Sequence, residues 1–225
     1  MATAGDVFHN PTTGERVTVL LGADDTDGRY LAASMAVPPG DCRLGEHLHP
    51  GLVEAFEVRR GRLTFSLDGE ERIARPGERI VVPRGARHDY WNDGPQDAEI
   101  LLEVWPAKRF EQLVGTLMGL AREGLVDEHG SPDPLQAAVT AREFRRELVL
   151  CSPPRWLQRV VNPVLAAIGR LCGMKGSYAR HAVPVDRVTV EHWDERPEPA
   201  AGEQAVAAVL GPVPVVSAGG GPAVV

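Results

Sequence analysis

The chain has 225 residues, of which 43% are hydrophobic and 24% are charged, and its formal net charge at pH 7 is −7. The hydrophobic content is sufficient for a buried core, which excludes a wholly disordered protein. The acidic surplus argues against nucleic acid as the main partner, because phosphate binding requires an excess of Lys and Arg. The length allows one large domain or one domain with an extension.

The N-terminal residues show neither a basic start nor an apolar run, so no signal peptide is visible and we expect a cytoplasmic protein. The three cysteines, Cys42, Cys151 and Cys172, lack the paired spacing of a disulfide framework or a zinc site. We therefore expect three reduced, partly buried thiols.

Residues 1–106 are predicted to form an all-β domain of short strands separated by Gly, Pro and Asp. Asp68-Gly69 is typical of a two-residue hairpin turn. Many short strands with regular turns favour an antiparallel sandwich or barrel. The expected strands are Arg16–Leu21, Tyr30–Val37, Leu52–Arg59, Arg62–Leu67, Arg79–Val82, His88–Trp91 and Ala98–Val104.

Residues 107–176 are predicted to form an α-helical extension. Apolar residues recur at helical spacing over 108–123, and Asp133-Pro134 is a typical N-cap and first position for a second helix. A third helix is expected over 153–171. The remaining residues, 177–225, are expected to be an irregular, flexible tail, because most of them are too small to offset the entropy cost of ordering.

The third predicted helix has two interpretations. Residues 156–171 include Arg159, Asn162, Pro163 and Arg170, and they are fewer than the roughly 20 apolar residues of a membrane span. We expect this helix to pack on the β-domain or on another subunit. Contact with a membrane surface is the less favoured alternative.

His47 and His49 stand on alternate residues, followed closely by Glu54. Alternate residues of a strand share one face, so the two imidazoles can converge on one ion. Pro50-Gly51 lets the chain bend so that Glu54 can reach back. A carboxylate beside two imidazoles suits a first-row divalent metal. A second segment, residues 77–92, brings one more histidine, His88, which taken alone is more often structural than a ligand.

Together, the two segments resemble the motifs of the cupin superfamily. Residues 40–61 match the first motif, G-x5-H-x-H-x3,4-E-x6-G, through His47, His49, Glu54 and Gly61, while Gly40 stands one residue too early. Residues 77–92 match the second motif, G-x5-P-x-G-x2-H-x3-N, through Gly77, Pro83, Gly85, His88 and Asn92. The resemblance covers residues from about 15 to 105, and the whole chain is also similar to actinobacterial-type cupins with a helical C-terminal segment.

The resemblance implies a cupin jelly-roll β-barrel that binds one divalent metal ion. Its ligands would be His47, His49, Glu54 and His88, and Asn92 would be part of the framework. Fe(II) is favoured, with Mn, Ni, Zn or Cu as alternatives. From strand parity, we expect three further side chains to point into the barrel: Phe56 and Val58 as pocket-lining residues, and Tyr90 as a candidate catalytic residue.

The functional hypothesis is a metal-dependent cupin enzyme acting on a small oxygen-rich organic molecule, with an oxidoreductase of the dioxygenase type favoured. The alternatives are a metal-dependent isomerase, cyclase or lyase, and a non-catalytic small-molecule-binding module. We expect a homodimer, because the resemblance implies pairing through barrel edges and the apolar helical faces over 110–121 and 156–171 need cover. No DNA-binding helix-turn-helix is evident, so we expect no nucleic-acid partner.

Overall fold

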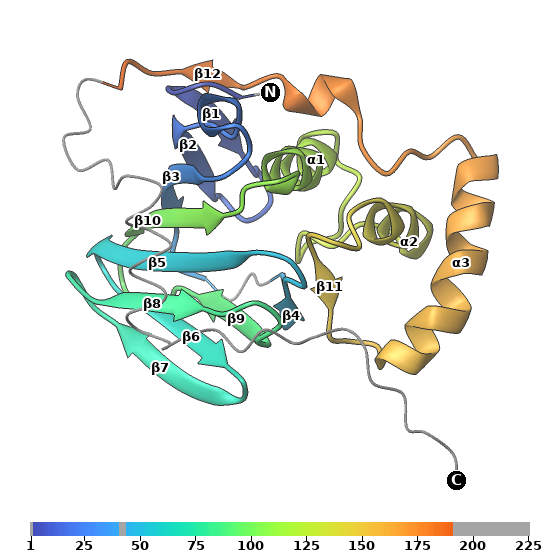
Figure 1. Cartoon of the computed structure of the whole chain (residues 1–225), viewed down its shortest axis with the longest axis horizontal. Coiled ribbons are helices and arrows are strands. Elements are labelled where there is room, and N and C mark those ends of the chain that lie inside the picture. Colours follow the sequence, from blue (N-terminus) through green and yellow to red (C-terminus); the bar gives the residue numbers. More distant parts are fainter. Residues whose placement is uncertain (1, 41–43, 191–225) are drawn as a thin grey trace, which may run out of the picture.

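The computed structural model describes residues 2–40 and 44–190, and it shows an all-β domain followed by helices (Figure 1). The strands form two antiparallel sheets that enclose one core. The seven-stranded sheet has the order β12-β1-β2-β3-β10-β5-β8, and the five-stranded sheet has the order β11-β4-β9-β6-β7. The predicted fold class, an all-β jelly roll with an α-helical C-terminal part, is therefore confirmed.

The elements have the following bounds. The seven-stranded sheet contains β1 (Asp6–His9), β2 (Arg16–Leu21), β3 (Leu31–Val37), β5 (Val53–Arg60), β8 (Arg79–Val82), β10 (Ala98–Trp105) and β12 (Asp186–Arg187). The five-stranded sheet contains β4 (His47–Leu48), β6 (Leu63–Leu67), β7 (Glu70–Ala74), β9 (His88–Trp91) and β11 (Val149–Leu150). The helices are α1 (Phe110–Arg122), α2 (Pro134–Glu143) and α3 (Arg155–Leu171), with short 3-10 turns η1 (Asp24–Thr26) and η2 (Ala179–Ala182).

All the strands expected from the sequence are present with nearly the expected bounds, and five others lie outside that set. Among the additional strands, β7 is polar and mostly exposed, so it lacks the apolar alternation of a half-buried strand. It forms because the Asp68-Gly69 turn places it beside β6, with Leu67 opposite Glu70. Both turn residues have left-handed φ angles, 50° and 88°, as a type I′ hairpin requires.

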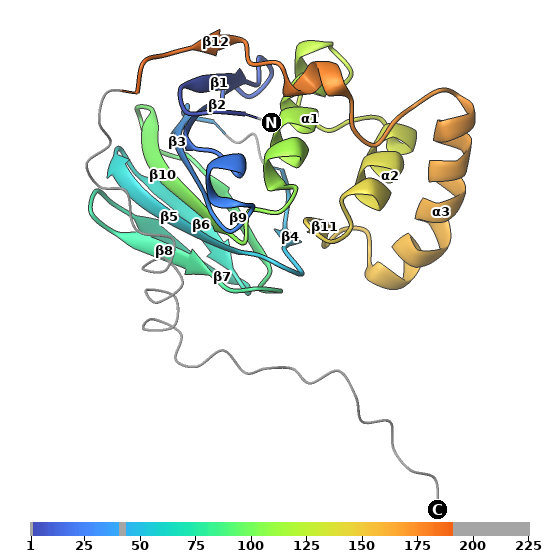
Figure 2. The same ribbon diagram turned by 45° about the horizontal axis from the view of Figure 1, so that its top comes forward.

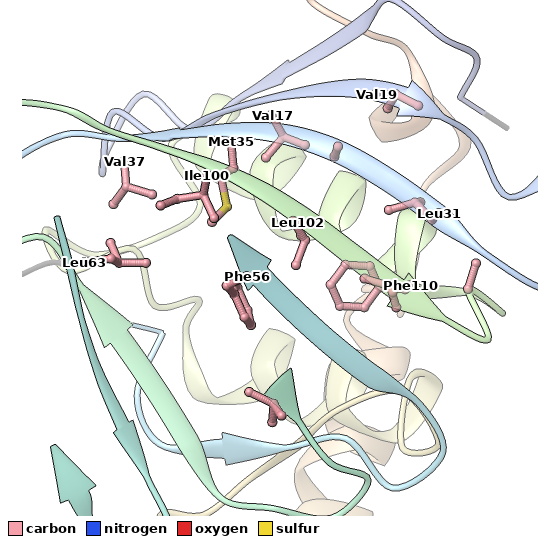
Figure 3. Packing of buried hydrophobic residues seen from close by; sticks show 14 of the residues in the cluster. Val17, Val19, Leu31, Met35, Val37, Phe56, Leu63, Ile100, Leu102 and Phe110 are labelled. Carbon is pink, nitrogen blue, oxygen red and sulfur yellow. The ribbon is translucent and has the colours of Figure 1, made fainter. Parts of the chain in front are cut away.

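The core lies between the two sheets and is closed at one end by α1 (Figure 3). The burial of β2 alternates along the strand, so one side of it faces this core. Phe110 and Met118 of α1 belong to the same buried cluster. The cluster also includes Phe8, Val17, Leu31, Met35, Val37, Phe56, Leu63, Phe65, Ile100 and Leu102.

The helices extend outward from the β-domain in sequence order (Figure 2). Leu113 of α1 packs with Phe144 and Leu148, which follow α2. Ala166 of α3 packs with Ala138 and Val139 of α2. Within the described chain the third helix thus packs on α2 and not on the β-domain, whereas its expected packing on another subunit stays a prediction. No helix in the described part of the chain has both the length and the apolar character needed to cross a membrane.

The described part of the predicted tail returns to the N-terminal strand. β12 pairs with β1, and the Arg187 guanidinium lies 2.6 Å from the Asp6 carboxylate. The part of the predicted tail after residue 190 lies outside the described residues. Cys42 also lies outside them, whereas Cys151 is free and half-buried and Cys172 is free and exposed.

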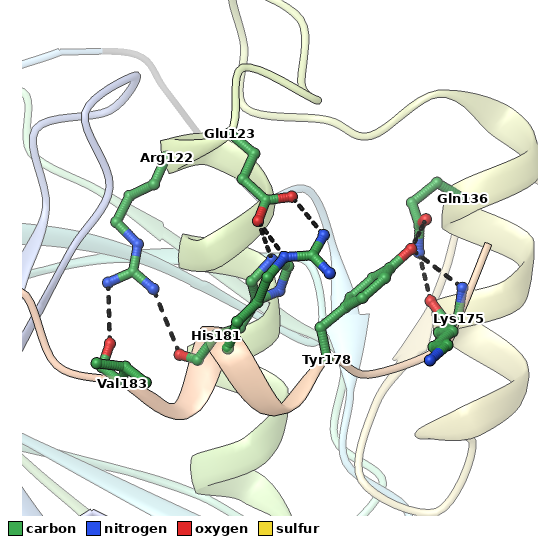
Figure 4. Close-up of polar contacts among 8 residues, drawn as sticks. Arg122, Glu123, Gln136, Lys175, Tyr178, His181 and Val183 are labelled. Carbon is green, nitrogen blue, oxygen red and sulfur yellow. Dashed lines mark hydrogen bonds and ion pairs between the residues drawn. The ribbon is translucent and has the colours of Figure 1, made fainter. Parts of the chain in front are cut away.

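Between α3 and β12, the segment containing η2 is held on α1 by polar contacts (Figure 4). The Arg180 guanidinium donates a 2.7 Å hydrogen bond to Glu123, and Nε2 of His181 lies 3.1 Å from the same carboxylate. These hydrogen bonds, with Arg180 as the largest cause, lower the pKa of Glu123 to about 2. The imidazole of His181 is buried directly over Gly119, where an added Cβ would lie 2.1 Å from its Cγ.

We expect Gly119→Ala to lower the free energy of unfolding by about 1–3 kcal/mol relative to Gly115→Ala. Both substitutions gain the same helix propensity. At Gly115, however, an added Cβ would lie 3.3 Å from the nearest atom, the His181 carbonyl oxygen, which needs only a slight shift, whereas Gly119→Ala must displace the His181 imidazole. Urea denaturation of the two variants measures the difference, and equal stabilities would contradict this packing.

Glu123→Gln is expected to reduce stability by about 0.5–1 kcal/mol at pH 7, as for a half-exposed ion pair. The pKa of Glu123 is lowered from 4.5 to about 2, so its contribution is complete above the unfolded pKa and is lost as the pH falls towards 2. The stability difference between the wild type and this variant should therefore shrink between pH 5 and about pH 3. Glu128→Gln, at a side chain that is 87% exposed, is the control. A difference independent of pH would contradict the assignment.

Candidate metal centre

Four predicted ligands come from three strands and one adjoining residue. β4 and β9 are neighbours in the five-stranded sheet, and His47 is paired in register with His88. His49 directly follows β4, and Glu54 lies on β5 of the opposite sheet. The structure brings all four together, and each has an exposed fraction of 4% or less.

The side chains converge at the distances expected for one coordination sphere. One ligand atom from each residue can be chosen so that all lie within 4.8 Å of one another. Oε2 of Glu54 is 3.0 Å from Nε2 of His49 and 3.0 Å from Nε2 of His88. A divalent ion at roughly 2.0–2.2 Å from each donor places neighbouring ligand atoms about 3 Å apart. The group therefore could bind a metal ion.

Backbone carbonyl groups orient all three imidazoles. Nδ1 of His47 lies 2.8 Å from the Gly45 carbonyl oxygen, and Nδ1 of His49 lies 2.5 Å from that of Glu147. Nδ1 of His88 makes a longer contact, 3.4 Å, with the Ala86 carbonyl oxygen. Because a carbonyl only accepts, these contacts place the proton of each neutral imidazole on Nδ1 and leave its Nε2 with a lone pair.

The resulting arrangement favours a bound cation. Nε2 of His49, Nε2 of His88 and Oε2 of Glu54 are buried and form no hydrogen bond within the described structure. Imidazole lone pairs thus face a carboxylate oxygen at 3.0 Å, with acceptor against acceptor. Unpaired buried acceptors cost about 1–3 kcal/mol each. A proton or a metal ion between them removes that cost, so the donor set fits a divalent ion.

Burial and mutual charge determine the protonation states in the absence of an ion. Burial, together with charge on His88 and His49, lowers the pKa of His47 to about 3. Burial alone lowers the pKa of His49, but the Glu54 carboxylate outweighs it and the net shift is upward. Burial raises the pKa of Glu54, yet the two neighbouring imidazoles hold it well below its usual range. His47 is therefore neutral and Glu54 is ionised at neutral pH, the states that ligate metals.

The group opens on an apolar cavity of about 150 Å³. His47, His49 and Glu54 form part of its wall. Most of the remaining wall is aliphatic or aromatic, with residues from the seven-stranded sheet and from α1. These residues include Phe8, Val17, Val19, Leu31, Ala33, Met35, Leu102, Phe110, Leu113, Val114, Leu117 and Met118.

Strand parity located two of the three expected pocket residues. Phe56 and Tyr90 both line the cavity, with ring centroids 5.5 Å apart. Val58 is fully buried in the core and is not among the residues that line the cavity in the described structure. It lies further along β5 from Glu54, where Leu63 and Ala98 share its cluster.

Glu15, which no sequence motif indicated, lines the same cavity. The hydroxyl of Tyr90 donates a 3.2 Å hydrogen bond to Glu15. Burial raises the pKa of Glu15, although hydrogen bonds from Thr13 and Tyr90 partly offset that effect. Burial also raises the pKa of Tyr90, with the charges of Glu15 and Glu54 contributing. Glu15 stands outside both sequence motifs, and only the pairing of β2 with the rest of its sheet brings it here.

Asn92 has the connections of a framework residue. Its side-chain amide donates to the carbonyl oxygens of Val37 (2.7 Å) and Gln96 (2.9 Å), and its Oδ1 accepts from the Gly94 amide (2.8 Å). Its side chain is 1% exposed. Because it directly follows β9 and bonds to Val37 at the end of β3, it ties the two strands together.

The segment after α2 completes the surroundings of the ligands. β11 pairs with β4, and Leu150 is opposite His47. The carbonyl that orients His49 belongs to Glu147, and Leu148 lines the cavity. The ring of Phe110 lies 5.9 Å from that of His49. The helical extension is therefore part of the site.

Comparison with known proteins gives matches of limited length. The chain is 33% identical over 79 residues to quercetin 2,3-dioxygenase of Bacillus subtilis, which covers 35% of this chain and 23% of that protein. It is 31% identical over 104 residues to protein SchB of Streptomyces halstedii, which covers 45% of this chain and 73% of SchB. The chain spans less than half the length of several other curated relatives that it matches.

Among solved structures, the chain is similar to a predicted oxalate decarboxylase from Thermotoga maritima, with 23% identity and a TM-score of 0.41. The alignment covers 47% of this chain and 98% of that one. Residues 33–105 match the family model described as Cupin domain. This match includes all four converging side chains and both sequence motifs, and we conclude that the chain belongs to the cupin superfamily.

Proposed function

We propose that the protein is a metal-dependent cupin enzyme that acts on a small, oxygen-bearing organic molecule, with dioxygenase chemistry favoured. One observation carries the proposal: three imidazole nitrogens and one carboxylate converge, all buried, at the wall of an apolar cavity. A catalytic metal site keeps a coordination position open towards a cavity, whereas a structural site is closed by protein ligands.

The similarity to quercetin 2,3-dioxygenase of Bacillus subtilis supports the dioxygenase assignment. His47, His49, Glu54 and His88 would hold the ion, and Fe(II) is the ion we favour because it suits imidazole and carboxylate donors and is redox-active. Such an ion would supply activation of dioxygen and polarisation of a substrate oxygen. With Mn, Ni, Zn or Cu in the same site, isomerase, cyclase or lyase chemistry becomes the alternative.

The volume of the cavity indicates which substrates fit inside it. A cavity of about 150 Å³ is comparable to one that accommodates benzene. A single-ring molecule or a short diketone therefore fits inside, whereas a molecule with several rings, such as a flavonol, would extend through the open side of the cavity. Phe56 and Leu102 supply apolar contact to such a molecule.

Glu15 and Tyr90 form a hydrogen-bonded polar pair in the cavity wall, which also includes Asn10, Thr13, Glu111 and His129 besides the proposed ligands. The raised pKa of Glu15 suits it to accept a proton from a substrate hydroxyl or an acidic C–H. The raised pKa of Tyr90 keeps its hydroxyl protonated, so that it orients Glu15 through their 3.2 Å hydrogen bond. In this proposal Glu15 is the general base and Tyr90 the positioning residue, a more limited role for Tyr90 than the sequence suggested.

The wild-type protein is expected to bind one redox-active divalent ion per chain, and His88→Ala is expected to lose at least about 10-fold in metal affinity. The reason is that His88 contributes one of the four proposed ligand atoms and lies 3.0 Å from Glu54, which it helps to keep from solvent. Metal content is measured by atomic emission after dialysis of protein expressed with added iron. His9→Ala, at a histidine outside the site, is the control. A metal-free wild type under these conditions would overturn the proposed enzyme.

Glu15→Gln is expected to lower kcat by about 10²–10⁴-fold while leaving the metal content unchanged, because it removes a general base and keeps the ligands. Tyr90→Phe should give a smaller loss and shift the pH profile of kcat. Oxygen uptake is measured with a panel of diketones, catechols and flavonols, and Glu71→Gln on exposed β7 is the control. Iron-loaded wild type that consumes no oxygen with any of them would favour the isomerase, cyclase or lyase alternative.

The non-catalytic binding module makes a different prediction from the enzyme, since it would bind a panel compound and return it unchanged. Product analysis of the same incubations distinguishes the two. The expected homodimer and the cytoplasmic location stay predictions, and sedimentation velocity tests the first.

A further inference from the structure

The outward side of α3 carries an uncovered apolar stripe. In Figures 1 and 2, α3 is the helix furthest from the β-domain. Its exposed apolar side chains are large: Trp156 is 68% exposed and Leu171 is 88% exposed. The stripe consists of Trp156, Val160, Val164, Ile168 and Leu171.

The spacing of these residues places them on one face of the helix. The first four recur every fourth residue and Leu171 follows three residues later, which keeps all of them within one apolar arc. The opposite face is the one that packs on α2, where Ala166 is fully buried and Gly169 allows close approach to Val139. The stripe therefore points away from the described residues that hold the helix in place.

Positive charge flanks one edge of the stripe although the protein as a whole is acidic. The sequence contains no acidic residue between Glu147 and Asp186. In that interval Arg155, Arg159 and Arg170 are exposed and form no ion pair with another described residue. The whole chain has a net charge of −7, so this local cationic surface is opposite in sign to the rest of the protein.

We propose that α3 is a membrane-surface helix that lies in the plane of an anionic lipid bilayer. Trp156 and the aliphatic side chains of the stripe would enter the boundary between headgroups and acyl chains, as in other interfacial amphipathic helices. The arginines would remain at the level of the phosphates, where each cation contributes to binding. The helix has 17 residues and includes Pro163, so it fits a position on the surface and not a span.

Charge complementarity favours a bilayer over a second copy of the chain. A two-fold contact brings the same patch of both subunits together, so the arginines of one α3 would approach those of the other. The interval from 148 to 185 offers no acidic residue to pair with them. An anionic bilayer provides both components that the surface lacks, an apolar phase and negative charge.

The proposal is independent of the proposed enzymatic function, because α3 contributes no residue to the metal centre or to the described wall of the cavity. The test is sedimentation of the full-length protein with vesicles of phosphatidylcholine alone or with about 30% phosphatidylglycerol. We expect binding to the anionic vesicles only, and weaker binding as salt is raised. No sedimentation with either vesicle would overturn the proposal.

Two variants separate the electrostatic and apolar contributions. The triple variant Arg155→Gln, Arg159→Gln, Arg170→Gln should weaken partitioning about 100-fold. The double variant Val160→Ser, Val164→Ser should weaken it about 10-fold or more by removing buried apolar carbon.

The control Arg72→Gln, Arg75→Gln, Arg84→Gln removes the same charge from exposed positions on the β-domain and should bind like the wild type. Unchanged binding by both α3 variants would overturn the proposal. So would a wild-type dimer that the double variant dissociates without lipid, since a second copy would then cover the stripe. Circular dichroism confirms that each variant is folded.

Discussion

The hydrogen bond from His49 to the Glu147 carbonyl is the contact on which the rest of the site depends. It joins a proposed metal ligand in the β-domain to the chain that follows α2, across 98 residues of sequence. It also places the proton on Nδ1, so that Nε2 faces Glu54 as a bare acceptor. β11 supports the same junction by pairing with β4. Without the helical extension, the ligand strand would lose a neighbour and His49 would lose its orientation.

Electrostatics then determines what the centre accepts. Buried imidazole nitrogens and a buried carboxylate face each other without an intervening proton donor, which is unfavourable in a medium of low dielectric constant. A divalent cation interacts with all these nitrogen and oxygen atoms at once, whereas a proton on His49 neutralises only the contact between His49 and Glu54. The upward shift in the pKa of His49 and the downward shift in that of Glu54 both reflect this need for positive charge.

The helices differ in what they contact along the chain. α1 faces the β-domain and forms one wall of the cavity, with Phe110 beside His49. α2 links it to α3, whose outward side is apolar and cationic and contributes nothing to the cavity that the structure describes. The contacts of η2 and β12 with α1 and β1 return the chain to the β-domain, so the first and last described segments are held together.

The sequence by itself determined the all-β fold, most strand bounds and the identity of the four converging residues, because strand alternation, turn residues and motif spacing are local properties. His47, His49, Glu54 and His88 could be found in this way since each lies at a fixed offset from a turn. Only the tertiary structure placed Glu15 beside Tyr90, assigned the orientation of His49 to a distant carbonyl, and showed that α3 packs on α2 with its apolar stripe exposed. These contacts join residues far apart in the chain, and no local pattern encodes which of them meet.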